Sequence, residues 1–206
     1  MFDAEAFILA GGRSSRMGRD KALLRLGEKT FVERISDALR SLVGERIKVV
    51  GARSAEASGG LPIVEDIYKE RGALGGLHAA FAHAQREWVF VIACDLPFTT
   101  GELLARLAAL RENFEAIVPV QRDGRLQPLC AVYRRVPCLR EAEKLIEVGE
   151  LRPRVLLGQV RTRRVTPEEW SDLEGAEAFF VNVNTPEEFA RAAEGGLNSA
   201  PPQRVV

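Results

Sequence analysis

The chain has 206 residues, and its 29 lysine and arginine residues balance 29 aspartate and glutamate residues, so the formal net charge at pH 7 is zero. This balance argues against a protein whose main partner is bulk nucleic acid or an anionic membrane. Hydrophobic residues make up 46% of the chain, which is enough for a sizeable core, and no apolar run approaches the ~20 residues of a membrane span.

The predicted elements alternate between strands and helices along the chain. We expect strands over residues 6–10, 47–50, 61–64, 88–93, 116–120, 130–133, 160–165 and 179–181. We expect helices over residues 30–42, 72–86, 100–111, 137–148, 152–157 and 186–193, with Thr30, Thr100 and Thr185 as N-caps. The nearly continuous apolar stretch 88–93 is typical of a central strand covered on both faces. This alternation predicts an α/β fold with a mainly parallel sheet.

The strand pair 116–120 and 130–133 flanks Asp123-Gly124, which predicts a long hairpin whose ladder is limited by Pro128. We expect residues 1–194 to form a single domain and residues 195–206, which include Pro201 and Pro202, to be a disordered tail. Three cysteines cannot all pair with one another, and the N-terminus lacks a signal-peptide pattern. Reduced thiols in a cytoplasmic protein are the simplest interpretation.

The first candidate motif, Leu9-Ala10-Gly11-Gly12-Arg13-Ser14-Ser15-Arg16-Met17-Gly18-Arg19-Asp20-Lys21, directly follows the first strand. Its glycines let backbone N–H groups approach phosphate oxygens, and Arg16 and Lys21 can neutralise phosphate charge. Neither the Walker spacing nor the dinucleotide-binding spacing is present, so an ATPase or a nicotinamide dehydrogenase is disfavoured. The alternative is a solvated loop without a ligand.

A second candidate is Asp95, at the carboxyl end of the most apolar strand. Ligands of open α/β sheets bind beyond the carboxyl ends of the strands, and Mg²⁺ takes one or two protein carboxylates together with phosphates and water. The alternative is an aspartate that caps the following helix. Together with the first motif, we favour Asp95 as a magnesium ligand.

Two further segments are weaker when taken alone. Asp66 follows a short strand and precedes the glycines Gly72, Gly75 and Gly76, a pattern that could equally be an ordinary acidic turn and helix start. Near the C-terminus, Asn182 and Asn184 would point to the same side of a strand and could hold a heterocycle or a phosphate. They could also make only local turn bonds.

In order and spacing, these segments resemble the molybdenum cofactor guanylyltransferases of the MobA type, over about residues 6 to 193. The matching patterns are L-A-G-G-x-S-x-R-M-G-x-D-K, E-D, G-x-L-G-G-L, C-D-x-P, Q-P-L and F-x-N-x-N-T-P-E-E. The resemblance implies a three-layer α/β/α Rossmann-like nucleotidyltransferase fold with a mainly parallel central sheet. It also implies transfer of GMP from GTP to molybdopterin, with release of pyrophosphate and assistance from Mg²⁺.

The resemblance also assigns roles to particular residues. Catalytic roles fall to Arg16, Lys21 and Asp95, with Asp95 as the metal ligand. The nucleotide-binding residues would be Leu9, Ala10, Gly11, Gly12, Lys21, Asp66, Gly72, Gly76 and Asp95. Asn182 and Asn184 would bind the pterin. Acceptor molybdoenzymes and other cofactor-biosynthesis proteins are the implied protein partners, whereas nucleic acid and membranes are not expected.

Two departures from the family pattern are Ala73, where proline is frequent, and Gly51, where some members have a nucleotide-contacting asparagine. Gly11 stands where related cytidylyltransferases carry alanine, which favours the larger purine of GTP. A cytidylyltransferase for the same cofactor, another small nucleotidyltransferase, and a GTP-binding cofactor escort without turnover remain the alternatives. We interpret His78 and His83 as packing or surface residues, and the five arginines between residues 152 and 164 as a solvated basic face rather than a site for the anionic cofactor.

Overall fold

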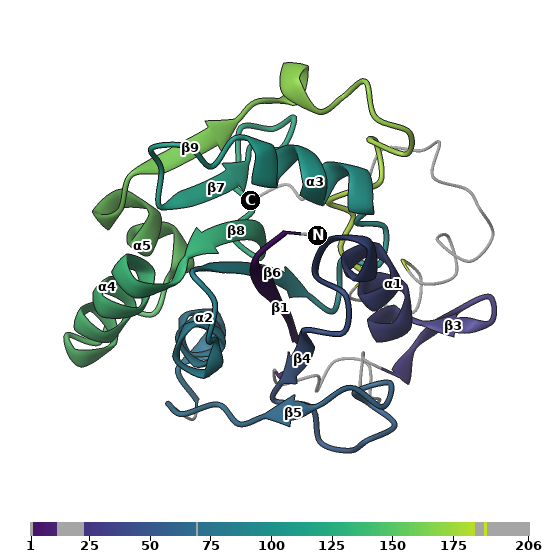
Figure 1. Ribbon diagram of the computed structural model, residues 1–206, viewed down its shortest axis with the longest axis horizontal. Coiled ribbons are helices and arrows are strands. Elements are labelled where there is room, and N and C mark those ends of the chain that lie inside the picture. Colours follow the sequence, from purple (N-terminus) through teal and green to yellow (C-terminus); the bar gives the residue numbers. More distant parts are fainter. Residues whose placement is uncertain (1, 12–22, 69, 184–187, 189–206) are drawn as a thin grey trace.

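The computed structural model describes residues 2–11, 23–68, 70–183 and 188. Within these ranges the chain forms a seven-stranded sheet in the order β5-β4-β1-β6-β8-β7-β9 (Figure 1). The strands are β1 (Ala4–Leu9), β4 (Ile47–Val50), β5 (Ile63–Val64), β6 (Trp88–Ala93), β7 (Ala116–Pro119), β8 (Cys130–Arg134) and β9 (Thr162–Val165). Only β8 runs antiparallel to its neighbours β6 and β7, so the predicted mainly parallel sheet is confirmed.

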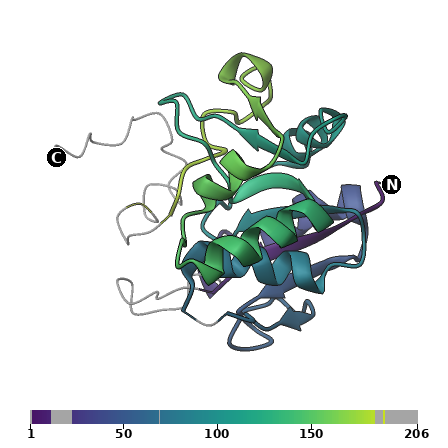
Figure 2. The same ribbon diagram turned by 90° about the vertical axis from the view of Figure 1, so that its left-hand side faces the viewer.

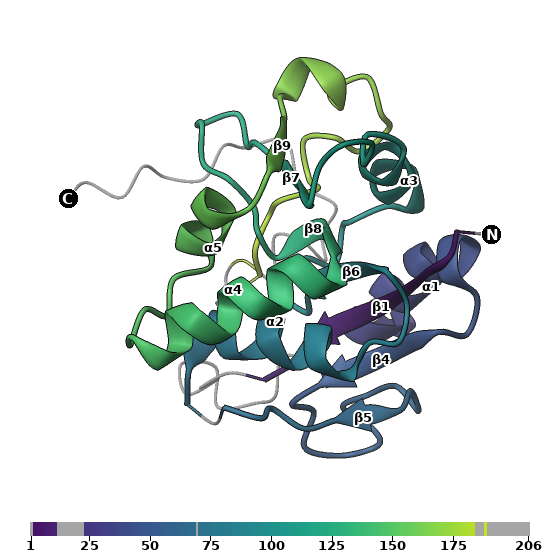
Figure 3. The same cartoon turned by 60° about the vertical axis from the view of Figure 1, so that its left-hand side comes forward.

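Helices cover both faces of this sheet. They are α1 (Phe31–Val43), α2 (Gly72–His83), α3 (Gly101–Ala109), α4 (Arg135–Glu147) and α5 (Pro153–Gln159). Helices α1 and α3 pack together on one face, and α2, α4 and α5 pack together on the other (Figures 1 and 3). Figure 2 shows the strand β1, in purple, running away from the N-terminal end of the described chain behind α2 and α4. The three-layer α/β/α architecture is therefore confirmed.

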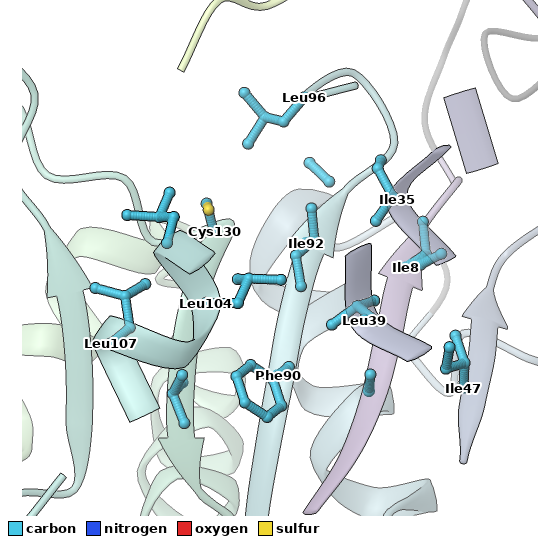
Figure 4. Packing of buried hydrophobic residues seen from close by; sticks show 14 of the residues in the cluster. Ile8, Ile35, Leu39, Ile47, Phe90, Ile92, Leu96, Leu104, Leu107 and Cys130 are labelled. Carbon is cyan, nitrogen blue, oxygen red and sulfur yellow. The ribbon is translucent and has the colours of Figure 1, made fainter. Parts of the chain in front are cut away.

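The central strands bury both of their faces, because alternate side chains enter two separate cores. Ile8 and Ile92 pack toward α1 and α3, where they meet Ile35 and Leu104 (Figure 4). Phe7, by contrast, belongs to the core beneath α2 and α4. Strand β6 follows the sequence prediction at both ends, which is what a continuous apolar run between two helical layers produces.

The predicted caps at Thr30 and Thr100 are also confirmed. The Thr30 hydroxyl accepts a hydrogen bond from the Glu33 backbone N–H at 3.2 Å, and the Glu33 carboxylate accepts one from the Thr30 N–H at 2.6 Å. This reciprocal capping box satisfies two backbone donors that the first turn of α1 would otherwise leave unpaired. The Thr100 hydroxyl accepts from the Leu103 N–H at 3.3 Å and starts α3 in the same way.

The expected strand over residues 179–181 is wrong, because this stretch consists of consecutive turns. Its aromatic side chains are held by packing rather than by a ladder: Phe179 is fully buried, and both Phe179 and Phe180 contact the ring of Trp170. A short two-stranded ribbon, β2 (Arg25–Leu26) with β3 (Lys29–Thr30), was not predicted from the sequence.

The predicted helix 186–193 and the tail 195–206 lie outside the described residues, apart from Glu188. The single-domain interpretation of residues 1–194 stays a prediction. Among the described residues, no helix is both long enough and apolar enough to cross a bilayer.

Candidate active site at the carboxyl edge of the sheet

The end of β1 lies between the ends of two neighbouring strands. The backbone N–H groups of Ala10 and Gly11 both donate to the Val50 carbonyl oxygen at the end of β4, at 3.0 and 3.2 Å. On the other side, the Cys94 N–H donates to the Leu9 carbonyl oxygen at 3.0 Å. These bonds bring the first candidate motif next to the residues that precede Asp95, as the shared direction of the strands predicts.

Two glycines meet where β1 and β4 end. Gly51 has a φ of +73°, and a Cβ added to it would lie 2.9 Å from the Gly11 Cα. Both the positive φ and the close backbone approach require glycine at position 51. At Gly11 an added Cβ would lie 3.5 Å from the Gly51 Cα, an ordinary contact, so this position can accept alanine.

Two consecutive glycines let helix α2 pack closely against the same edge of the sheet. A Cβ at Gly76 would lie 3.2 Å from the Leu9 Cδ1, and a Cβ at Gly75 would lie 3.4 Å from the Asp66 Oδ1. The helix therefore touches the end of β1 and the segment after β5 within one turn. Gly72 begins this helix with a φ of +58° and has open space where a side chain would stand.

Asp95 follows β6 through Cys94 and is half-buried. Its carbonyl oxygen accepts a hydrogen bond from the Val183 N–H at 3.1 Å, which joins the C-terminal candidate motif to the end of β6. Asn182, next to Val183, is exposed. Because residues 181–183 form no strand, the expected alternation that would point Asn182 and Asn184 to one side has no structural basis.

The protein environment changes the ionisation of the Asp66 carboxyl. Burial raises its pKa, and this effect is opposed by a backbone hydrogen bond from Tyr68 and by the nearby imidazole of His78. One of its oxygens, Oδ1, is buried and has no hydrogen-bond partner in the described part of the chain. A buried acceptor of this kind is normally satisfied by a donor from the protein, water or a ligand.

The donor set limits what metal could bind. Within the described ranges, no group of three or more His, Cys, Asp or Glu side chains is arranged to hold an ion. Mg²⁺ needs only one or two protein carboxylates when phosphates and water supply its other ligands. The Asp95 carboxylate therefore has the chemistry that a magnesium–nucleotide complex needs from a protein.

Four of the predicted site residues, Gly12, Arg16, Lys21 and Asn184, lie outside the described residues. The remaining ones, Leu9, Ala10, Gly11, Asp66, Gly72, Gly76, Asp95 and Asn182, lie at the carboxyl edge of the sheet or on the elements attached to it.

The arginines between residues 152 and 164 are largely engaged with local carboxylates. Arg152 pairs with Glu150, and hydrogen bonds from Arg152 lower the pKa of Glu150 to about 2. Arg161 and Arg163 pair with Glu115 and Glu169. These pairs agree with a solvated basic face rather than an open site for an anion.

A hollow of about 500 Å³ opens at the opposite end of β6 from Asp95 and is lined by residues that include Trp88, Phe114 and Arg134. Two of its charged groups already pair with each other, Arg134 with Glu87 at 2.8 Å. It contains none of the predicted site residues. We therefore place the candidate site at the carboxyl edge and not in this hollow.

Sequence reasoning missed the environment of His78. The side chain is 3% exposed and lies in α2 beside Tyr68, with ring centroids 4.7 Å apart. No spacing rule links a histidine in a helix to a tyrosine ten positions earlier, so no sequence signal could have identified this contact.

Comparison with known proteins gives a consistent result. A family model described as "MobA-like NTP transferase domain" matches residues 6–163. The chain is 36% identical over 200 residues to a protein named "Probable molybdenum cofactor guanylyltransferase" from Pelotomaculum thermopropionicum, covering 97% of this chain and 96% of that protein. A molybdenum cofactor guanylyltransferase from Desulfosudis oleivorans is 29% identical over 187 residues, covering 90% and 92% of the two chains.

Among solved structures, molybdopterin-guanine dinucleotide biosynthesis protein A from Archaeoglobus fulgidus has a TM-score of 0.77 with this chain at 24% sequence identity. The match covers 92% of this chain and 97% of that protein. At this level of identity the likeness concerns the fold, which it shares along nearly its whole length.

Proposed function

Because this chain belongs to the family of MobA-like NTP transferase domains and is therefore a nucleotidyltransferase, we propose that it transfers GMP from GTP to molybdopterin. The products are the guanine dinucleotide form of the cofactor and pyrophosphate. The observation that carries the proposal is the convergence of Leu9–Gly11, Asp66 and Asp95 on one edge of the sheet, next to the motif that contains Asn182.

The base assignment depends on the end of β1. The backbone of Leu9, Ala10 and Gly11 would lie against the guanine, with Gly76 packed behind the Leu9 side chain. The Ala10 and Gly11 N–H groups are engaged by Val50, which holds this backbone rigidly in place. A fixed backbone at position 11 without a side chain leaves room for a purine, so we propose GTP rather than CTP.

The chemistry requires no covalent intermediate with the protein. A phosphate oxygen of molybdopterin attacks the α-phosphorus of GTP in line, and the bond from that phosphorus to the pyrophosphate oxygen breaks. Positioning and neutralisation of charge supply most of the catalysis in such transfers. Arg16 and Lys21 would hold the triphosphate and stabilise the charge that develops on the leaving pyrophosphate.

Asp95 would hold Mg²⁺ together with the phosphates of the nucleotide, and the bound ion would withdraw charge from them. Asp66 would contact the nucleotide from the side of β5. Asn182 and Asn184 would bind the pterin, which places the acceptor next to Asp95 through the bond between Val183 and the Asp95 carbonyl.

We also propose a cytoplasmic location, in which acceptor molybdoenzymes and other cofactor-biosynthesis proteins are the partners. The cysteines Cys130 and Cys138 agree with this location, because both are buried thiols outside any disulfide.

The proposal is tested by Asp95→Asn, which keeps the size of the side chain and removes its charge. We expect Mg²⁺-dependent turnover with GTP and molybdopterin to fall by about 10²–10³-fold, as expected for loss of a ligand to a catalytic ion. Asp37→Asn, on the exposed face of α1 where Asp37 pairs with Lys29 and Arg40, is the matched control and should retain full turnover. Retained turnover in Asp95→Asn would show that this residue is not the metal ligand, and GTP binding without turnover in the wild-type protein would favour a cofactor escort.

A further inference from the structure

Both histidines of the chain lie on α2 and contact the same short segment, residues 65–68. The His83 Nε2 donates to the Glu65 carbonyl oxygen at 3.2 Å. The His78 ring packs edge-on against Tyr68, with an angle of 72° between the ring planes. Two contacts, one from each histidine, therefore hold the segment that contains Asp66 against α2.

The two histidines differ in how their nitrogens are satisfied. Although His78 is almost completely buried, neither its Nδ1 nor its Nε2 makes a hydrogen bond to any residue that the structure describes. The Glu143 Oε1 of α4 lies 3.5 Å from the His78 Nε2. The buried Oδ1 of Asp66 likewise accepts no hydrogen bond from the residues that the structure describes. Buried polar atoms are seldom left unpaired, and a residue needed only for packing here would be better served by an apolar side chain.

The position of this pair links it to the candidate site. Gly75 brings α2 against the Asp66 Oδ1 and the Tyr68 carbonyl oxygen, at 3.4 and 3.1 Å from a Cβ built on the glycine. The next residue, Gly76, brings the same helix turn against Leu9 at the end of β1. A change at His78 is therefore transmitted to Asp66 across a tightly packed helix turn, in which there is little room for the segment to adjust independently.

We propose that His78 is a positioning residue that orients the Asp66 carboxylate for the nucleotide, with Glu143 bracing the opposite side of the imidazole. In this role a ring nitrogen of His78 would donate to the Asp66 Oδ1, so that one buried atom of each residue gains a partner. This inference rests on the proposed function, since it takes Asp66 to be a nucleotide contact.

The test is a double-mutant cycle between His78 and Asp66, read out as the dissociation constant for GTP and as separate KM and kcat values. We expect His78→Leu to weaken GTP binding about tenfold and to raise KM with little change in kcat, since it removes the partner of a buried carboxylate. His78→Gln, which keeps a donor and an acceptor, should recover most of the affinity. In the Asp66→Asn background, His78→Leu should change the affinity less than about twofold, because the group on which it acts is gone.

His83→Leu is the matched control, because it makes the same substitution on the same helix and loosens the same segment without facing Asp66. Its effect on GTP affinity should be equal in the two backgrounds. Additive effects of His78→Leu and Asp66→Asn, or no rescue by His78→Gln, would overturn the proposal and leave His78 as a packing residue. Thermal unfolding of each variant identifies any loss of affinity that comes from loss of the fold.

The same measurements separate this inference from the proposed function. Failure of the wild-type protein to bind GTP would contradict the proposed function. If it binds CTP instead, the cycle run with CTP decides the role of His78. Unchanged nucleotide affinity in Asp66→Asn would overturn the inference, because Asp66 would then not be a nucleotide contact.

Discussion

The close approach of Gly51 to Gly11 can be tested by adding a single methyl group. Gly51→Ala places an L-residue at a φ of +73° and puts its Cβ 2.9 Å from the Gly11 Cα. Gly60→Ala is a matched control, because Gly60 has a φ of +76° but nothing within 4 Å of the added Cβ. The two variants share the conformational penalty and differ in the clash.

The expected magnitudes follow from these two contributions. The left-handed conformation costs a residue with a Cβ about 1–2 kcal/mol, so Gly60→Ala should lower the free energy of unfolding by about that amount. Overpacking against backbone that cannot rotate away adds about 1–3 kcal/mol, so Gly51→Ala should lower it by about 2–5 kcal/mol in total. A domain with a stability of about 5–15 kcal/mol tolerates the control easily.

Urea unfolding measures the stability difference, and a GTP titration measures its consequence for the site. We expect Gly51→Ala to displace Gly11 and to weaken GTP binding, whereas Gly60→Ala leaves the dissociation constant unchanged. Equal destabilisation by the two substitutions, or unchanged GTP affinity in a folded Gly51→Ala protein, would refute the argument that this approach shapes the nucleotide site.

Three further predictions concern ionisation and local stability. Burial raises the pKa of Asp66, so the folded state keeps this proton to a higher pH than the unfolded chain, and the stability it contributes at low pH is lost as the pH rises through the raised pKa. Asp66→Asn should therefore gain stability relative to wild type as the pH is raised from about 4 to 7, and a constant difference in urea unfolding across that range would contradict this. Thr30→Ala removes the hydroxyl that caps α1 and should cost about 1 kcal/mol in the same assay, whereas no measurable loss would show that the cap is replaced by water. Burial raises the pKa of the Cys130 thiol to about 12, so Cys130 should react with a disulfide reagent at pH 8 only when the protein unfolds, and rapid labelling of the native protein would refute its placement.

Helices and strands that are determined by their own local sequence could be predicted. Strand β6 needs only its apolar run, and α1 needs only Thr30, Glu33 and a periodic apolar face, so both were predicted close to their observed bounds. Residues 179–181 carry the same local signal as a buried strand, yet their aromatic side chains are buried by packing on Trp170 instead. A three-residue apolar run cannot distinguish these outcomes, because the difference lies in distant partners.

Some contacts of the candidate site could likewise be predicted from the sequence, and others could not. The meeting of the β1 and β6 ends follows from strand direction, and so Gly11 and Asp95 could be placed on one edge from the sequence. Two other contacts depend on how segments that are far apart in the sequence pack together. They are the hydrogen bond from the Val183 N–H to the Asp95 carbonyl oxygen and the ring contact of His78 with Tyr68. Neither has a periodicity or a spacing that sequence reasoning could use.

The central claim is that the carboxyl edge of this sheet transfers GMP to molybdopterin. Pyrophosphate release in the presence of Mg²⁺ and molybdopterin, compared for GTP, CTP and ATP, tests it most directly. We expect pyrophosphate release with GTP that depends on molybdopterin, and much slower release with CTP or ATP. Preference for CTP would contradict the assignment of the base at Gly11, and no release with any of the three nucleotides would contradict the proposed reaction itself.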